Sequence, residues 1–73
     1  MLRKVTDTQG EVWEVVRGSE SYGMMVVLFC RISDGRVMKS YLHADSAMAA
    51  DAEVDASSDA ELLERLDDAE PGP

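Results

Sequence analysis

Residues 21–43, SYGMMVVLFCRISDGRVMKSYLH, contain the stretch that decides the fold of this 73-residue chain. Seven apolar residues run without a break over 24–30, and periodicity alone does not separate a buried helix from a buried strand in so short a run. The flanking residues do, because Gly23 opens the run and Asp34-Gly35 follows it, a dipeptide typical of β-hairpin turns. The stretch therefore predicts a β-hairpin whose first arm is a central strand buried on both faces.

The register of this hairpin has two alternatives. A two-residue loop at 34–35 places Cys30 opposite Lys39. A three-residue loop at 33–35, with the glycine in the left-handed region, shifts the pairing by one residue and places Cys30 opposite Met38. The three-residue loop pairs apolar with apolar residues more often, so it is the preferred alternative.

Two further segments of the N-terminal half have the composition of strands. Residues 11–17, EVWEVVR, are rich in β-branched and aromatic residues and predict a strand. A turn signal at residues 8–10, TQG, precedes it, so residues 2–6 are expected to pair back across the turn. Residues 18–23, GSESYG, carry two glycines and two serines and predict a loop.

The segment after the hairpin has little to bury. Residues 44–57, ADSAMAADAEVDAS, are mostly alanine, acid and serine. This composition is consistent with a short frayed helix capped by Asp45 or Ser46, and equally with a mobile linker. The sequence does not decide between the helix and the linker.

Residues 58–69, SDAELLERLDDA, predict an acidic amphipathic helix. Ser58 and Glu61 have the spacing of a capping box, and Glu61 precedes Arg65 by four residues, the favourable order for a helical ion pair. An apolar stripe along one side consists of Leu62, Leu66 and Ala69. About ten residues are too few for a helix that is stable alone in water, so these leucines are expected to dock on a sheet or on another chain.

Together these segments predict an α+β fold that is mainly β. Residues 1–43 form a small antiparallel meander sheet of three to four strands, with the Asp34-Gly35 hairpin in it. Residues 44–57 connect the sheet to residues 58–73, which hold the acidic helix and a Pro-Gly-Pro tail. The helix covers one face of the sheet, and the other face keeps apolar residues and is the expected surface for self-association or for a partner.

The acidic character of the chain is confined to its C-terminal part. Residues 1–43 hold six basic and five acidic residues, whereas residues 44–73 hold one arginine and ten acidic residues, a net charge of −9. Such segregation is typical of an interaction segment, although acidic tails also serve only to keep small proteins soluble. The basic residues of the hairpin form a thin patch on a chain of net charge −8, which argues against direct nucleic-acid binding.

Size and cysteine content limit how this chain is stabilised. A domain of 73 residues buries roughly 60% of its unfolded-chain surface and is marginal alone. Its single cysteine, Cys30, cannot form an intrachain disulfide, so a homodimer is expected, and the cytoplasm is the expected compartment. No membrane association is expected, because a membrane helix needs about 20 apolar residues and no export signal is recognisable.

Neither a catalytic set nor a metal or cofactor site is expected. His43 and Asp45 are too few for a zinc site, which needs three or four ligands. Cys30 and His43 would lie roughly 13 Å or more apart along the hairpin, too far for a nucleophile pair. The alternating acids at 51, 53 and 55 are followed by an alanine where an EF-hand calcium loop needs glycine.

Three functional hypotheses follow. The first is a non-catalytic protein-interaction module, an adaptor or regulatory subunit, whose protein partner is of unknown identity and could be basic. The second is an acidic inhibitor, of the phage-encoded kind, that imitates a nucleic-acid backbone and fills the basic groove of a nucleic-acid-binding protein. The third and least supported is an enzyme that uses His43. The residues expected to contact a partner are Trp13, Tyr41, Leu62, Leu66, Asp67 and Asp68.

Overall fold

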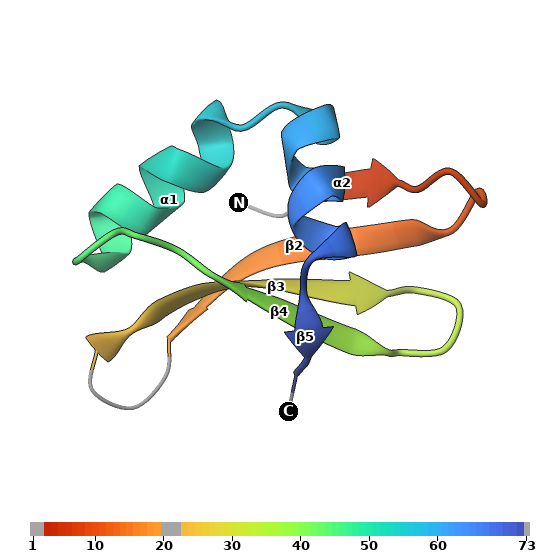
Figure 1. Cartoon of the computed structure of the whole chain (residues 1–73), viewed down its shortest axis with the longest axis horizontal. Helices are drawn as coiled ribbons and strands as arrows, with labels where there is room; N and C mark the ends of the chain where they lie inside the picture. The colour runs from red at the N-terminus through yellow and green to blue at the C-terminus, as the bar shows by residue number, and fades with distance from the viewer. Residues whose placement is uncertain (1–2, 20–22, 73) are drawn as a thin grey trace.

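Figure 1 shows the computed structural model of the chain, which describes residues 3–19 and 23–72. Five antiparallel strands form one sheet in the order β1-β2-β3-β4-β5, and two helices lie between the fourth and fifth strands in the chain. The elements are β1 (Arg3–Thr6), β2 (Val12–Ser19), β3 (Met25–Arg31), β4 (Val37–Tyr41), α1 (Ala47–Ala56), α2 (Asp59–Asp67) and β5 (Glu70–Pro71). The predicted mainly β, α+β fold with a meander sheet is confirmed, with more strands and one more helix than expected.

The turn between β1 and β2 is held by Asp7. Its Oδ1 atom accepts hydrogen bonds from the backbone N–H groups of Gln9 and Glu11, both at 2.9 Å. Gly10 has a φ of 83°, a backbone conformation in which a side chain would be strained. The turn predicted at this place therefore forms around one carboxylate and one glycine.

Both predicted registers of the β3–β4 hairpin are wrong. Cys30 pairs with Val37, because the loop holds four residues between Arg31 and Arg36, whose N–H and carbonyl groups are joined at 2.8 Å. The Asp34 carboxylate stabilises this longer loop, since it binds the Arg31 guanidinium and accepts a hydrogen bond from the Arg36 N–H at 3.1 Å. The Asp-Gly signal located the turn, and the contact between Asp34 and Arg31 set its length.

β2 is longer than predicted, and the loop expected at 18–23 begins later. Gly18 lies inside β2 and pairs with Val26. A Cβ atom at Gly18 would lie 2.9 Å from Cδ1 of Leu28 and 3.2 Å from Cγ2 of Val26, so the glycine gives these two side chains room to pack over β2. Residues 20–22 of the predicted loop lie outside the described residues.

The segment at 44–57, for which the sequence allows a helix or a linker, contains α1. Ser46 is its N-cap and accepts a hydrogen bond from the Ala49 N–H at 3.1 Å. Ala50 and Val54 are its buried residues and belong to the core. These two small apolar side chains dock the helix on the sheet together with polar contacts from the strands, in which Arg3 donates to the Val54 carbonyl at 2.9 Å and Arg17 binds Asp51 at 2.7 Å.

α2 begins with the predicted capping box. Ser58 Oγ accepts from the Glu61 N–H at 3.1 Å, and Glu61 Oε1 accepts from the Ser58 N–H at 2.8 Å. Leu62 is fully buried in the core, so the helix docks on its own sheet. Arg65 donates to Glu53 of α1 at 2.7 Å and thereby joins the two helices.

The residues after α2, which were expected only to end the helix, extend the sheet. β5 pairs with β4, with Glu70 opposite Lys39. The Gly72 N–H donates to the Val37 carbonyl at 2.9 Å, and a Cβ atom at Gly72 would lie 2.7 Å from Cγ1 of Val37. A strand of two residues that includes a proline has no readable alternation, which is why the sequence did not indicate it.

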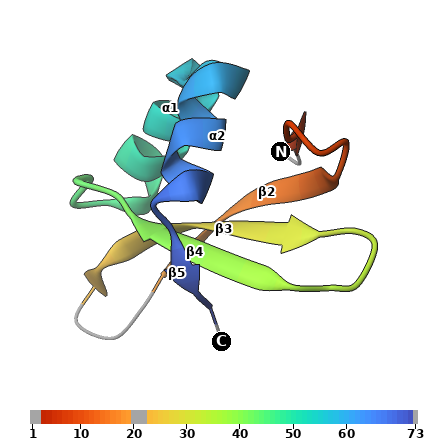
Figure 2. The ribbon, with the colours of Figure 1, turned by 45° about the vertical axis from the view of Figure 1, so that its right-hand side comes forward.

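The sheet has one covered face and one open face. Figure 2 shows both helices on the same side of the sheet. The core lies between the helices and the sheet. It consists of Val5, Trp13, Val15, Val27, Phe29, Leu42, Ala50, Val54 and Leu62. Because side chains alternate along strands and paired residues share a face, the other side, here named the open face, carries Lys4, Thr6, Val12, Glu14, Val16, Gly18, Val26, Leu28, Cys30, Val37, Lys39, Tyr41 and Glu70.

Candidate functional site

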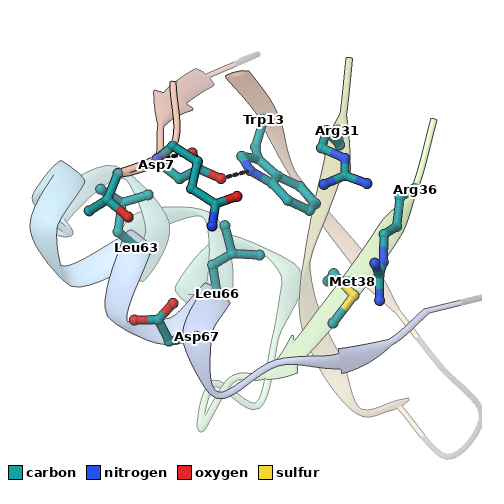
Figure 3. A pocket seen from close by; sticks show the side chains of 10 residues that line it. Asp7, Trp13, Arg31, Arg36, Met38, Leu63, Leu66 and Asp67 are labelled. Atoms are coloured by element: carbon teal, nitrogen blue, oxygen red, sulfur yellow. Dashed lines mark hydrogen bonds between the residues drawn. The ribbon is translucent and has the colours of Figure 1, made fainter. Parts of the chain in front are cut away.

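A cavity of about 330 Å³ lies between α2 and the end of the sheet that holds the β1–β2 turn (Figure 3). Three parts of the chain form its walls: the β1–β2 turn with Trp13 of β2, the adjoining ends of β3 and β4, and the C-terminal half of α2. This volume is at the lower end of the roughly 300–1,000 Å³ of ligand pockets. The cavity can therefore take one large side chain or a small group.

Apolar side chains line the inner part of the cavity. Trp13 of β2 is 5% exposed, and Met38, Leu63 and Leu66 are half-buried around it. Figure 3 shows the two leucines on the helix side and Met38 on the strand side. Apolar surface that keeps some exposure gains free energy when a further apolar group excludes water from it.

Arg31 lies against the tryptophan ring on the strand side. Its Cζ atom is 5.4 Å from the centroid of the Trp13 ring, a cation–π distance. The same guanidinium donates two hydrogen bonds to Asp34, at 2.9 and 2.6 Å. These hydrogen bonds lower the pKa of Asp34 to about 2 and raise the pKa of Arg31, because they stabilise the charged form of each group. Both charges of this pair are thus engaged within the protein.

Asp7 occupies the turn side of the cavity and is engaged as well. Its Oδ2 atom accepts a hydrogen bond from Trp13 Nε1 at 3.0 Å, while Oδ1 holds the turn. The hydrogen bond from Trp13 lowers the pKa of Asp7 more than burial raises it. The Asp7 carboxylate therefore accepts hydrogen bonds that hold both the Trp13 ring and the turn in place.

Two charged side chains of the cavity have no hydrogen-bonding partner for their charged groups among the described residues, although the nearby Arg36 charge helps to lower the pKa of Asp34. Within residues 3–19 and 23–72, neither the Arg36 guanidinium nor the Asp67 carboxylate makes a hydrogen bond or ion pair. Figure 3 shows Asp67 on the helix side and Arg36 on the strand side. The cavity thus combines apolar lining with one available charge of each sign on opposite walls.

The residues predicted as partner contacts separate into three places. Trp13, Leu66 and Asp67 line the cavity together. Tyr41 lies on the open face with 39% of its surface exposed, while its backbone carbonyl accepts a hydrogen bond from Arg65 of α2 at 3.2 Å. Asp68 is the exposed C-cap of α2, and Leu62 is fully buried in the core, so its side chain is not on a surface.

The sequence did not single out Asp7, Arg36, Met38 and Leu63 as parts of this site. The turn signal around Asp7 was legible, but its hydrogen bond to Trp13 depends on how β1 pairs with β2. Arg36 and Met38 reach the cavity through the actual β3–β4 register, which neither predicted register gave. The signal that could have found them is the alternation of 36 and 38 with the open-face positions 37 and 39.

The two helices carry an acidic layer. Three of its carboxylates are neutralised by arginines: Arg3 binds Asp59 at 2.8 Å, Arg17 binds Asp51 at 2.7 Å and Arg65 binds Glu53 at 2.7 Å. In the described part of the chain, the exposed carboxylates of the helices and their ends that have no arginine partner are Asp45, Asp55, Glu61, Glu64, Asp67 and Asp68, of which Glu61 accepts the Ser58 N–H in the capping box. The excess negative charge is therefore available to a partner on the helix side of the molecule.

Over 3–19 and 23–72, no group of three or more His, Cys, Asp or Glu side chains is arranged to hold a metal ion. Cys30 is opposite Val37, whereas His43 lies beyond the far end of β4. Within the same ranges, neither helix has the length and hydropathy that crossing a bilayer requires.

Comparisons of the chain with protein-family models, with curated proteins and with solved structures found no significant match.

Proposed function

We propose that this chain is a small non-catalytic protein-interaction module, an adaptor or regulatory subunit that binds a protein through the cavity beside α2. The observation that supports this function is the apolar lining of the cavity together with the uncommitted charges of Asp67 and Arg36. Protein interfaces concentrate their binding energy where an apolar or aromatic anchor enters a pocket that a polar rim shields from water. The cavity has both parts of such a site.

The charges around the cavity define the partner's chemistry. Asp67, with Asp68 and Glu64 beside it on α2, favours basic side chains on the helix side. Arg36 favours a carboxylate or a backbone carbonyl on the strand side. The partner segment is therefore an apolar anchor that is flanked by lysine or arginine and that lies across the cavity with its basic part toward α2.

The proposal places the chain in the cytoplasm. Cys30 is its single cysteine and is free, which is ordinary for a protein of a reducing compartment.

A second candidate is the acidic inhibitor that imitates a nucleic-acid backbone. The exposed, unpaired carboxylates of the helical layer support it. The three arginine pairs within that layer weigh against it, because they interrupt a continuous negative track. This inhibitor would bind with a steep dependence on salt and would be displaced by nucleic acid, whereas an interface with an apolar anchor keeps much of its affinity in high salt.

A quantitative pull-down with matched variants tests the proposed function. The tagged chain, its D67K variant and its D55K variant are incubated with native lysate and washed at low and high salt. Asp67 lines the cavity and Asp55 is an exposed acid of α1, so both substitutions change the charge equally and only the first changes the cavity wall. We expect one protein that the chain and D55K retain through the high-salt wash and D67K loses.

Two results would contradict this proposal. Equal retention of every captured protein by D67K and by D55K would remove the cavity as the binding site. Loss of all captured protein in high salt, with displacement by added nucleic acid, would favour the acidic inhibitor instead.

A further inference from the structure

The open face of the sheet carries most of the large apolar side chains that remain exposed. Among the described residues these are Met24, Ile32, Tyr41 and Met48, with exposed fractions of 48%, 51%, 39% and 83%. Tyr41 lies on the open face, and Met24 and Ile32 lie directly beyond the two ends of β3, at positions an even number of residues from its open-face residues Val26, Leu28 and Cys30. Only Met48 lies elsewhere, on α1. Half-buried apolar side chains fill the area between them and include Val12, Val16, Leu28, Cys30 and Val37.

Four charged side chains also lie on this face, in a regular order. Lys4 of β1 is opposite Glu14 of β2, and Lys39 of β4 is opposite Glu70 of β5. The open-face positions of β3 between them are apolar. Across the five strands the charge therefore runs positive, negative, apolar, positive, negative, and it sums to zero on a chain of net charge −8.

The charge orders on the open faces of two copies of the chain are complementary to each other. A twofold rotation about an axis parallel to β3 places β1 of one copy against β5 of another and β2 against β4. Lys4 then faces Glu70 of the other copy, and Glu14 faces Lys39. Glu14 lies in the row of Cys30, and Lys39 lies in the row of Leu28. These rows are two residues, roughly 7 Å, apart along β3, a distance that long lysine and glutamate side chains can span.

We propose that the open face binds a second copy of this chain and that the two sheets stack face to face as a homodimer. Stacked sheets lie about 10 Å apart, so the apolar side chains of both copies meet at the centre. The acidic helices lie on the outer sides, and their repulsion is screened because the two layers are separated by more than the ~8 Å Debye length of physiological salt.

The size of the face sets the strength of this dimer. The five strands have four, eight, seven, five and two residues, so with about 3.3 Å per residue and about 4.8 Å between strands they make a face of roughly 400 Å². That area is below the ~800 Å² that each partner of a standard interface buries. The dimer is therefore reversible and depends on concentration. It goes beyond the proposed function and leaves the cavity beside α2 accessible in both copies.

Charge-reversal variants at Glu14 and Lys39 test this dimer by sedimentation equilibrium over a range of concentrations. In E14K the new charge faces Lys39 of the other copy, and in K39E it faces Glu14, so each variant repels itself. We expect both variants to keep the 8.0 kDa mass of one chain at concentrations where the unmodified chain reaches twice that mass. An equimolar mixture of the two restores opposite charges at both contacts, so we expect it to reach the doubled mass.

Two variants that change charge off the open face serve as controls. E64K alters an exposed acid of α2, and R36E alters the cavity wall, so both are expected to dimerise like the unmodified chain. Thermal melting followed by circular dichroism verifies that each variant is folded. Cys30 supplies a second measurement, since its thiol lies on the open face and should react several-fold more slowly with an uncharged maleimide as the dimer forms.

Two results would overturn the proposal. The first is a single-chain mass for the unmodified chain up to millimolar concentration, with constant Cys30 reactivity. The second is a doubled mass that E14K and K39E reach at the same concentrations as the unmodified chain does. Neither result bears on partner binding at the cavity, because the pull-down with D67K tests that site separately.

Discussion

The Trp13 indole N–H donates a hydrogen bond to Oδ2 of Asp7 at a distance of 3.0 Å. The tryptophan ring is part of the core, and the other oxygen of Asp7 holds the turn that forms one wall of the cavity. A single pair of residues therefore couples the stability of the fold to the shape of the candidate site.

Replacement of Asp7 should lower the stability of the fold and also change the shape of the candidate site. In D7A the indole N–H and the turn N–H groups lose their acceptor, so we expect a lower melting temperature and a red-shifted fluorescence of the single tryptophan. Fluorescence and circular dichroism during thermal unfolding measure the two effects. The matched control is D55A, an exposed acid without a partner among the described residues, which should melt like the unmodified chain.

Truncation of Trp13 should cost about 3–5 kcal/mol of unfolding free energy, because its ring is nearly fully buried. Urea denaturation followed by circular dichroism gives this value, and W13F should cost less because it keeps a ring in the core. Near-native stability of W13A, together with lost partner binding, would show that Trp13 is an interface residue and not a core residue.

The docking of α2 depends on Leu62. The substitution L62A leaves a hole beneath the helix, so we expect a loss of about 2–5 kcal/mol. The control M48A removes the side chain that is 83% exposed on α1 and should change the unfolding free energy by no more than about 0.5 kcal/mol. If L62A is as stable as M48A, α2 does not pack on the sheet as described.

Acid should weaken the β3–β4 loop in a defined range. The pKa of Asp34 is about 2 in the folded chain and 3.8 in its ordinary state, since Arg31 stabilises the carboxylate. A lowered folded pKa means that the stabilisation is complete well above pH 3.8 and is lost as the pH falls from there through about 2. D34N lacks this carboxylate, so its melting temperature should lie below that of the unmodified chain at neutral pH and converge with it near pH 2. A difference that stays constant down to pH 2 would show that the ion pair does not contribute.

The sequence was most informative where local chemistry and hydrophobic patterning agree. Asp34-Gly35, the β-branched run at 11–17 and the Ser58–Glu61 capping box predicted the meander and the start of α2. The register failed because Asp34 reaches back to Arg31, a side-chain contact that lengthens the loop. β5 failed because two residues carry no period and its pairing depends on where α2 ends.

Only some residues of the candidate site were predicted from the sequence. Trp13 was predicted as a partner contact because aromatic side chains are enriched at interfaces, Leu66 because it belongs to the apolar stripe of the helix, and Asp67 because it belongs to the segregated acidic segment. Arg36 and Met38 could not be joined to them, because only the folded sheet brings the start of β4 beside α2. The self-complementary charge order of the open face likewise exists only once the strand order and both registers are fixed.

The most direct test of the interaction module is an NMR titration of the ¹⁵N-labelled chain with the protein captured in the pull-down. The chain has one tryptophan, so the indole N–H of Trp13 gives one resonance from the cavity. We predict that this resonance and the amides of Leu63, Leu66 and Asp67 shift together, while the amide of Met48 stays in place. Shifts confined to open-face residues such as Leu28 and Tyr41, with the indole resonance unmoved, would contradict the account.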